Sequence, residues 1–268
     1  MAVMATAFAR MIGAVLLLAF ASITAPVLAA DRLSARVELY GPLGIHVLTV
    51  RTTLDQTEER YSATVDYATI GLAGILFEQK THAVATGRVA RATAYPDTFR
   101  NDTVRNGVAR RSQVDYRPDG TVNGSSAPPT KTVVPPESMR GTVDNVSAYL
   151  RLERQLAETG KCAMTVPVFD GRHRYDLVFA DAGKQQLSPE GGQKFSGPAI
   201  ACRMTRHNRF VEAAEEDEGA SQGMFWYATF VPGEVPLPVR MKLQTQLGSV
   251  DGYLAEVQGP GVNRRLLD

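Results

Sequence analysis

Apolar and polar side chains alternate along most of the sequence. In residues 33–39, for example, apolar side chains occupy every second position and polar ones lie between them, which is the period of a half-buried β-strand. The same alternation recurs in residues 45–54, 61–67, 81–89, 108–116, 164–168, 175–179 and 239–245, and residues 247–257 are expected to close the sheet. Short turns join many of these stretches, so the sequence predicts a mainly β fold built on one large antiparallel sheet.

Several segments interrupt this pattern. Two glycines disfavour a regular strand in residues 71–77, so we expect a short helical turn or a loop over the mouth of the sheet there. Its apolar side chains either pack into the core or form a lip for an apolar ligand. Residues 95–97 contain a proline and are expected to interrupt the sheet. Residues 119–130 are expected to be an exposed loop, followed by a short strand at 131–134.

One segment is convincingly helical. Apolar side chains recur there at spacings of three and four, between an N-cap at Thr142 or Asp144 and a stop at Gly160. Glu153 falls in the same stripe. A single amphipathic helix among many strands is most simply buried against the concave face of a strongly curved sheet, here over the small side chains of residues 81–89. The alternation does not distinguish an open half-barrel from a closed barrel.

The first 29 residues have the form of a secretory signal peptide. Arg10 is the only charge before the apolar run 14–21, and Ala29 supplies the small residue of the cleavage site. The alternative is a retained membrane anchor, but the apolar run is shorter than the roughly 20 residues that span a bilayer. We therefore expect cleavage after Ala29, export to the periplasm, and a soluble mature chain, residues 30–268, that forms a single β domain.

Charge and motifs argue against several classes of function. The leader holds one of the 29 Lys and Arg residues, which leaves 28 against 28 Asp and Glu residues, and a neutral chain has no electrostatic footprint for nucleic acid. The four histidines lie in separate segments, and no HExxH, GxSxG or P-loop motif occurs. Arg174 and Asp176 are expected to form an ordinary surface ion pair. We expect no enzyme activity, no cofactor and no metal site.

The two cysteines, Cys162 and Cys202, bracket a hairpin of two alternating strands with a turn at Asp170 and Gly171. An exported protein folds in an oxidising compartment, and no CxxC or Cys/His metal spacing is present, so a disulfide is predicted. The alternative is two free structural thiols. A bridge would close a loop of about 41 residues and clamp the hairpin to a later strand.

Several motifs resemble those of one protein family. They are Gly141-Thr-Val-Asp-Asn-Val-Ser-Ala-Tyr-Leu150, Cys162, Val168-Phe-Asp-Gly-Arg-His-Arg-Tyr-Asp-Leu177 and Gly197-Pro-Ala-Ile-Ala-Cys202. Together with the leader, they resemble domain-of-unknown-function family 3108 of proteobacterial envelopes over nearly the whole mature chain. The family name carries no activity. The resemblance implies a periplasmic β protein similar in fold to the open half-barrels of lipoprotein carriers, in which a curved sheet wraps helices over an apolar cavity.

Two functions of different classes follow as hypotheses. The first is a noncatalytic periplasmic protein of the cell envelope that binds an apolar molecule, such as a lipid or lipoprotein acyl chain, between sheet and helix. Its candidate lining residues are Leu72, Ile75, Leu76, Phe77, Val146, Tyr149 and Leu150. The alternative is a structural or protein-interaction module that contacts another envelope protein through its sheet edges and residues 72–77.

Overall fold

The computed structural model describes residues 31–212, 219–245 and 248–267, without the side chains of Leu72 and Leu76. The leader predicted at residues 1–29 lies outside the described residues. In chain order the elements are β1 (Asp31–Tyr40), the 3₁₀ turn η1 (Pro42–Gly44), β2 (His46–Gln56), β3 (Arg60–Thr69), α1 (Gly71–Leu76), β4 (Gln79–Ala90), β5 (Thr93–Arg105), β6 (Val108–Tyr116), β7 (Val122–Ala127), α2 (Pro136–Met139), α3 (Asn145–Thr159), β8 (Met164–Phe169), β9 (Arg174–Leu187), β10 (Gly197–Phe210), β11 (Gln222–Ala228), β12 (Leu237–Thr245), β13 (Gly248–Gly259) and β14 (Val262–Arg265). Of the helices in these ranges, none is long and apolar enough to cross a membrane.

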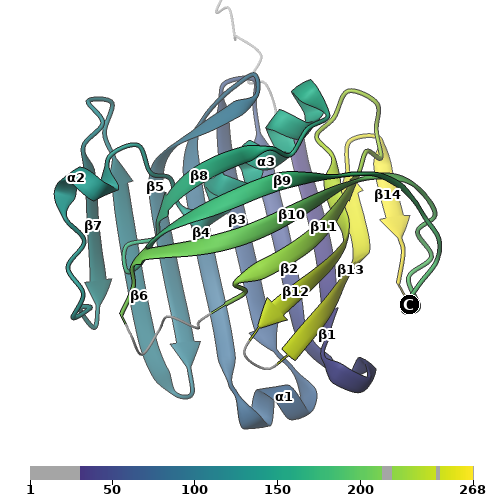
Figure 1. Ribbon diagram of the computed structural model, residues 1–268, viewed down its shortest axis with the longest axis horizontal. Coiled ribbons are helices and arrows are strands. Elements are labelled where there is room, and N and C mark those ends of the chain that lie inside the picture. The colour runs from purple at the N-terminus through teal and green to yellow at the C-terminus, as the bar shows by residue number, and fades with distance from the viewer. Residues whose placement is uncertain (1–30, 213–218, 246–247, 268) are drawn as a thin grey trace, which may run out of the picture.

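The fourteen strands of the described residues form one antiparallel sheet (Figure 1). Its hydrogen-bonded order is β7-β6-β5-β4-β3-β2-β1-β13-β12-β11-β10-β9-β8, and β14 pairs with β13. Most neighbours are consecutive in sequence, as short turns allow, whereas the pairing of β1 with β13 joins the two halves. The sheet curls so that β8 to β11 pass in front of the strands β3 to β5 (Figure 1), and β7 and β8 remain its two ends. The predicted fold, a large and strongly curved antiparallel sheet, is confirmed, and the sheet is open, a point that the alternation alone left undecided.

The helix α3 lies inside the curve of the sheet, as predicted (Figure 1). Asp144 is its N-cap and accepts a hydrogen bond of 2.8 Å from the backbone nitrogen of Ser147. Gly160 ends the helix with a φ of 66°, a conformation that favours glycine. Leu150 packs against the small side chains of β4, while Leu152 is buried among apolar side chains of β8 to β11. The helix therefore fills the space between the two walls of the curved sheet.

Residues 95–97 do not interrupt the sheet, so that prediction is wrong. They lie within β5, and Pro96 faces Gly87 of β4 at a β-bulge that follows Thr86. A Cβ atom on Gly87 would lie 2.2 Å from the carbonyl oxygen of Tyr95, which is closer than real atoms approach. The proline is accommodated because its partner has no side chain and the pairing is irregular at this point.

The segment after β6 also differs from the prediction. Residues 131–134 form no strand, and the strand β7 lies within the predicted loop 119–130. Asn123 and Gly124 are of residue types that are depleted in strands, so no local pattern indicated a strand there. The strand forms because it pairs with β6 and because Gly124 leaves room for the ring of Phe169, which an added Cβ would approach to 2.4 Å. The two ends of the sheet therefore meet through side chains.

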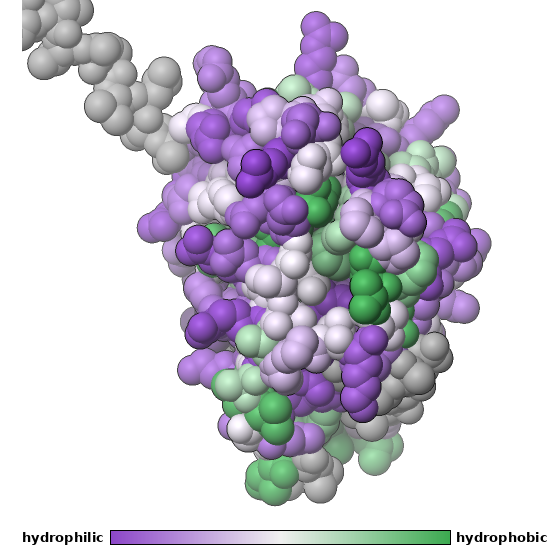
Figure 2. Space-filling model, turned by 90° about the vertical axis from the view of Figure 1, so that its left-hand side faces the viewer, coloured by the Kyte–Doolittle hydropathy of each residue, from purple (hydrophilic) through white to green (hydrophobic). Residues whose placement is uncertain are grey.

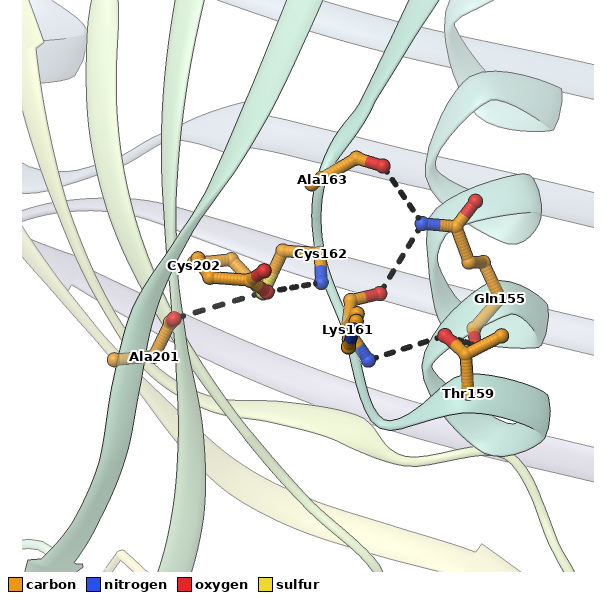
Figure 3. The surroundings of a disulfide bond; sticks show 8 residues. Gln155, Thr159, Lys161, Cys162, Ala163, Ala201 and Cys202 are labelled. Carbon is orange, nitrogen blue, oxygen red and sulfur yellow. Dashed lines mark hydrogen bonds between the residues drawn. A yellow bond between two sulfur atoms is a disulfide. The ribbon is translucent and has the colours of Figure 1, made fainter.

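The predicted disulfide between Cys162 and Cys202 is confirmed, with an S–S distance of 2.03 Å and a separation of 40 residues along the chain (Figure 3). The side-chain amide of Gln155 donates hydrogen bonds of 3.2 and 3.1 Å to the carbonyl oxygens of Lys161 and Ala163. These bonds fix the last turn of α3 to the segment that carries Cys162 (Figure 3). The disulfide then ties that segment to β10, so helix and sheet are clamped together at this point.

The ion pair between Arg174 and Asp176 is not at the surface, so that prediction is wrong in this respect. The two side chains are 2.6 Å apart but only 13% and 12% exposed. The segment at α2 covers them, because the carbonyl oxygen of Ser138 accepts a hydrogen bond of 2.9 Å from Arg174 Nε. Burial raises the pKa of Asp176, but hydrogen bonds from Arg174 and Arg209 outweigh it and lower the pKa overall.

Candidate functional site

The three side chains predicted to line a ligand on α3 lie in different surroundings. Leu150 is buried in a cluster with β3, β4 and β5, and Val146 packs against the same cluster. Tyr149 faces the other wall, with its ring centroid 5.9 Å from that of Phe179 and 5.7 Å from that of Phe225. Tyr149 is therefore the one of the three that reaches toward β9 and β11.

The side chains predicted at α1 lie elsewhere. Figure 1 shows α1 at the end of the sheet opposite α3. Ile75 is exposed, and the ring of Phe77 lies 4.6 Å below the guanidinium carbon of Arg105. The side chains of Leu72 and Leu76 lie outside the described residues. The structure therefore does not bring the residues of α1 and of α3 together in one site.

The strands give the concave face of the sheet an apolar lining. Tyr61 of β3 faces the helix, because its hydroxyl lies 2.7 Å from that of Ser147 on α3. Val65 is four residues farther along the same strand and therefore points to the same, concave face. Side chains in register on the neighbouring strands share that face. Those next to α3 are buried, but six apolar ones farther along remain half-buried. We call these six the concave apolar surface: Leu48, Val50, Val65, Met241, Leu243 and Val250.

Three polar side chains lie at the α3 end of the concave apolar surface. Tyr149 and Glu153 are one helical turn apart on α3, and Tyr227 comes from β11 close enough for their charges to act on its pKa. Met241 and Leu243 pack on the same buried cluster as these two tyrosines. In the part of the chain that the structure describes, the side-chain oxygens of the three residues have no hydrogen-bond or ion-pair partner. We call Tyr149, Glu153 and Tyr227 the polar cluster.

Burial decides the protonation of the polar cluster. It raises the pKa of Glu153 to about 8 with no opposing charge. It also raises the pKa of Tyr149 to about 12, against the nearby cation of Arg206. For Tyr227 burial is again the largest cause of a raised pKa, followed by the charges of Glu153 and Tyr149. At pH 7 all three groups are therefore mainly neutral, and each offers an O–H donor as well as lone pairs.

Polar groups in such surroundings are normally paired. A fully buried oxygen without a partner costs about 1 to 3 kcal/mol, so an oxygen that has no protein partner needs access to water or to a ligand. None of the three is among the fully enclosed unpaired atoms of the described residues, so a small ligand group can reach them. An apolar lining with a few convergent polar groups is the usual composition of a ligand site. The composition of this part of the concave face thus resembles that of a site for an amphipathic molecule.

Sequence reasoning identified only part of this site. Tyr149 was predicted as a lining residue, but Glu153 and Tyr227 were not. The sequence did contain a signal for Glu153, since an acidic residue stands in the apolar stripe of the helix. No signal pointed to Tyr227, because its position beside α3 depends on the curl of the sheet between residues far apart in the sequence.

A second buried polar network is structural. Ser147 Oγ donates a hydrogen bond of 2.5 Å to Asp144 and lies 2.7 Å from the hydroxyl of Tyr61. All three residues are buried. Burial raises the pKa of Asp144 to about 6, against hydrogen bonds from Ser147, and burial followed by the charge of Asp144 raises the pKa of Tyr61. Each polar group here has a partner, so the network fixes the start of α3 to β3 and does not need a ligand.

Replacing Ser147 by Ala should lower the free energy of unfolding by about 1 to 3 kcal/mol, because Tyr61 and Asp144 each lose a buried hydrogen-bond partner. Urea denaturation followed by circular dichroism would measure it. Ser62→Ala is a suitable control, since Ser62 is on the same strand as Tyr61 and the described residues offer its hydroxyl no partner. Equal stabilities of the two variants would contradict the assigned role.

The histidines do not converge on a common site. Three of them lie next to acidic residues near them in the sheet or turn: His46 beside Glu38, His82 beside Asp66 and His173 beside Asp170. The fourth, His207, is exposed on β10. In residues 31–212, 219–245 and 248–267, no group of three or more His, Cys, Asp and Glu side chains is placed to hold a metal ion.

Comparisons with known proteins identify the family of the chain. The family model described as "Protein of unknown function (DUF3108)" matches residues 34–255. Among solved structures, the chain is similar to a beta-barrel-like protein of domain of unknown function DUF1849 from Brucella abortus, with a TM-score of 0.48 and 11% identity, over 87% of this chain and 99% of that one. No curated protein matches the chain. Because the family model covers more than half of the sequence, the chain belongs to the DUF3108 family, as its motifs predicted.

Proposed function

We propose that this chain is a noncatalytic protein of the cell envelope, exported to the periplasm, that binds an apolar molecule such as a lipid or lipoprotein acyl chain. The acyl chain lies on the concave apolar surface, and the polar end of the ligand lies at the polar cluster. The observation that carries the proposal is the polar cluster itself. Its three neutral side chains lie within the curved sheet beside half-buried apolar side chains, and none of them has a partner among the residues that the structure describes.

The chemistry of the two parts is complementary to an acyl compound. Each methylene group moved from water onto an apolar surface contributes about 0.8 kcal/mol, so a long chain gains most of its affinity from the concave apolar surface. The polar cluster adds O–H donors for a carboxyl, ester or amide oxygen of the ligand. Because burial keeps Glu153 protonated at pH 7, it donates to such an oxygen instead of repelling it.

Two further features support the compartment and the absence of catalysis. The signal-peptide pattern of the leader and the disulfide between Cys162 and Cys202 both fit an oxidising compartment outside the cytoplasm. The polar cluster consists of one carboxylic acid and two phenols and contains no paired nucleophile and base. Binding is therefore the function that its chemistry supports best.

Filling the concave apolar surface should exclude the ligand. Val65→Trp places a large side chain on the concave face of β3, whereas Val84→Trp adds the same volume to the outer face of the neighbouring strand β4. The wild type and both variants are expressed with the leader and purified from the periplasm of the producing cells. Bound lipid is then extracted and quantified per mole of protein by mass spectrometry. We expect the amount recovered with Val65→Trp to fall about tenfold or more and that with Val84→Trp to equal the wild type.

The outcome that contradicts the proposal is equally clear. If the wild-type protein carries no apolar molecule, or if both tryptophan variants retain the same amount, the concave apolar surface is not the site. A protein that is empty but can be crosslinked to another envelope protein would instead support the structural or protein-interaction module.

A further inference from the structure

The charge of the polar cluster decides which polar end of an acyl compound it accepts. Figure 2, seen from the side of β7 and α2, shows hydrophilic side chains over most of that outer face, whereas the concave apolar surface lies within the curve of the sheet. A molecule whose acyl chain lies on this surface therefore brings its polar end to the polar cluster. The cations and acids around the cluster then select the ligand.

The cations of α3 are engaged elsewhere. Arg151 Nε donates a hydrogen bond of 2.7 Å to the carbonyl oxygen of Ala94, and Arg154 Nε donates one of 2.9 Å to that of Arg91. Both acceptors belong to the hairpin of β4 and β5, so these two guanidinium groups serve to fix the helix to the sheet. Burial is the cause that raises the pKa of Glu153, with no cation to oppose it.

Among the described residues, Arg206 of β10 is the cation that acts on the polar cluster. Its guanidinium carbon lies 4.2 Å from the centroid of the Tyr175 ring on β9, in a cation–π contact. Burial raises the pKa of Tyr149 against the charge of Arg206, whereas the pKa values of Glu153 and Tyr227 respond to burial and to the cluster itself. The strands β12 and β13 face the cluster with apolar side chains. The cation therefore stands at the Tyr149 side and leaves the acid without an opposing charge.

A cationic polar end does not suit this arrangement. Ammonium groups are recognised by open aromatic ring faces, but the rings here pack on one another. The centroid of Tyr149 lies 5.9 Å from that of Phe179 and 5.7 Å from that of Phe225, and the ring of Tyr227 stacks on Phe225 at 6.3 Å. The acid of the cluster is protonated at pH 7, and the charge of Arg206 repels a second cation.

An anionic polar end is disfavoured as well, whereas a neutral carbonyl fits. An ionised carboxylate that leaves water needs an opposing charge, and Glu153 has no cation beside it. A neutral carbonyl oxygen needs only donors. Tyr149 and Glu153 are four residues apart on α3, so their side chains lie one above the other on the same face of the helix. The two lone pairs of one carbonyl oxygen can accept hydrogen bonds from both O–H groups.

We infer that the molecule bound on the concave apolar surface has an uncharged polar end that accepts hydrogen bonds, such as the ester or amide carbonyl of an acylated molecule. The site discriminates against the free carboxylate of a fatty acid with the same chain. This inference rests on the proposed function and narrows its ligand to one chemical class. It also separates acylated molecules from the fatty acids that their hydrolysis releases.

The acid of the polar cluster makes this binding depend on pH. The carboxyl group of Glu153 donates a hydrogen bond only while it is protonated, and its pKa in the folded chain is about 8. The affinity for a neutral carbonyl should therefore fall as the pH rises through 8, by about tenfold between pH 7 and pH 9. Tyr149 keeps its proton in this interval, because its pKa is about 12.

The inference is tested by isothermal titration calorimetry with three probes that share one alkyl chain length. They are N-methyldodecanamide, sodium dodecanoate and dodecyltrimethylammonium chloride, each below the concentration at which it forms micelles. The protein is purified from the periplasm and freed of lipid on a hydrophobic resin. At pH 7 we expect the wild type to bind the amide about tenfold or more tightly than either ion. The amide does not titrate, so a change of its affinity with pH belongs to the protein.

Two variants assign the pH dependence. Glu153→Gln should bind the amide equally at pH 7 and pH 9, because glutamine does not ionise, whereas Glu158→Gln, on the exposed side of the same helix, should follow the wild type. A wild-type affinity that is the same at both pH values would overturn the inference, as would a change with pH that persists in Glu153→Gln.

The outcomes also separate this inference from the proposed function. Dodecanoate or the ammonium probe bound as tightly as the amide, and lost in Val65→Trp, would overturn the inference and leave the proposed function standing. If no probe binds, or if Val65→Trp binds each probe as the wild type does, the proposed function fails and the inference fails with it.

Discussion

Replacing both Cys162 and Cys202 by Ala lowers the free energy of unfolding by about 4 kcal/mol. The disulfide joins residues 40 apart, and the chain-entropy relation gives about 4 kcal/mol for a loop of that length. For a domain of this size, such a loss lowers the melting temperature by about 10 °C. Alanine is chosen because both cysteines are fully buried, where a serine hydroxyl would add the cost of an unpaired polar group.

Thermal and urea denaturation of the oxidised wild type, the reduced wild type and the double variant would test this prediction. The reduced wild type should approach the double variant in stability, and a reducing agent should leave the double variant unchanged. A stability difference below about 1 kcal/mol between the oxidised wild type and the double variant would show that the disulfide does not clamp α3 and β10. The loss of a specific activity without a loss of stability would point to a role beyond structure.

Local signals were sufficient to predict much of the fold. Alternation in residues 33–39 and 61–67 gave the strands and the faces they bury, because side chains of a strand point alternately to its two sides. Gly160 marked the end of α3, and Asp144 was one of two candidates for its N-cap, through the backbone conformations that they favour. The disulfide followed from compartment and cysteine number. In each case the information lies within a few residues or in composition.

Long-range contacts account for what the sequence did not reveal. β7 has no strand propensity of its own and forms because β6 lies beside it. Pro96 stays within β5 only because Gly87 lies opposite. The candidate site also depends on contacts between residues far apart in the sequence. Glu153 stood out as an acid in an apolar stripe, but its neighbour Tyr227 depends on the pairing of β1 with β13, which brings the second half of the sheet over the helix.

The stability of the wild type should fall as the pH rises from about 4.5 to about 8, because of Glu153. Burial raises its pKa from 4.5 to about 8, so in this interval the unfolded chain has released a proton that the folded chain still holds. Stability therefore decreases with pH, by up to about 1.4 kcal/mol per pH unit. The free energy of unfolding is highest below pH 4.5, and its decrease is complete above pH 8. We expect a total decrease of about 2 to 5 kcal/mol, where the lower figure allows for the partial exposure of the Glu153 side chain to solvent.

Glu153→Gln isolates this effect, because glutamine has nearly the same shape and cannot ionise. Urea denaturation at several pH values should give equal stabilities for wild type and variant near pH 4 and a variant more stable by about 2 to 5 kcal/mol near pH 8. The pKa of Asp144 is also raised, but Asp144 is present in both proteins, so its contribution cancels in the difference between their stabilities. Glu158→Gln is the control, since Glu158 is exposed on the same helix.

Parallel curves for wild type and Glu153→Gln would show that Glu153 is not buried, and would remove the polar cluster on which ligand binding is proposed. A divergence between the curves would show that the chain keeps an acid that lowers its stability near neutral pH, which is a common property of side chains at functional sites.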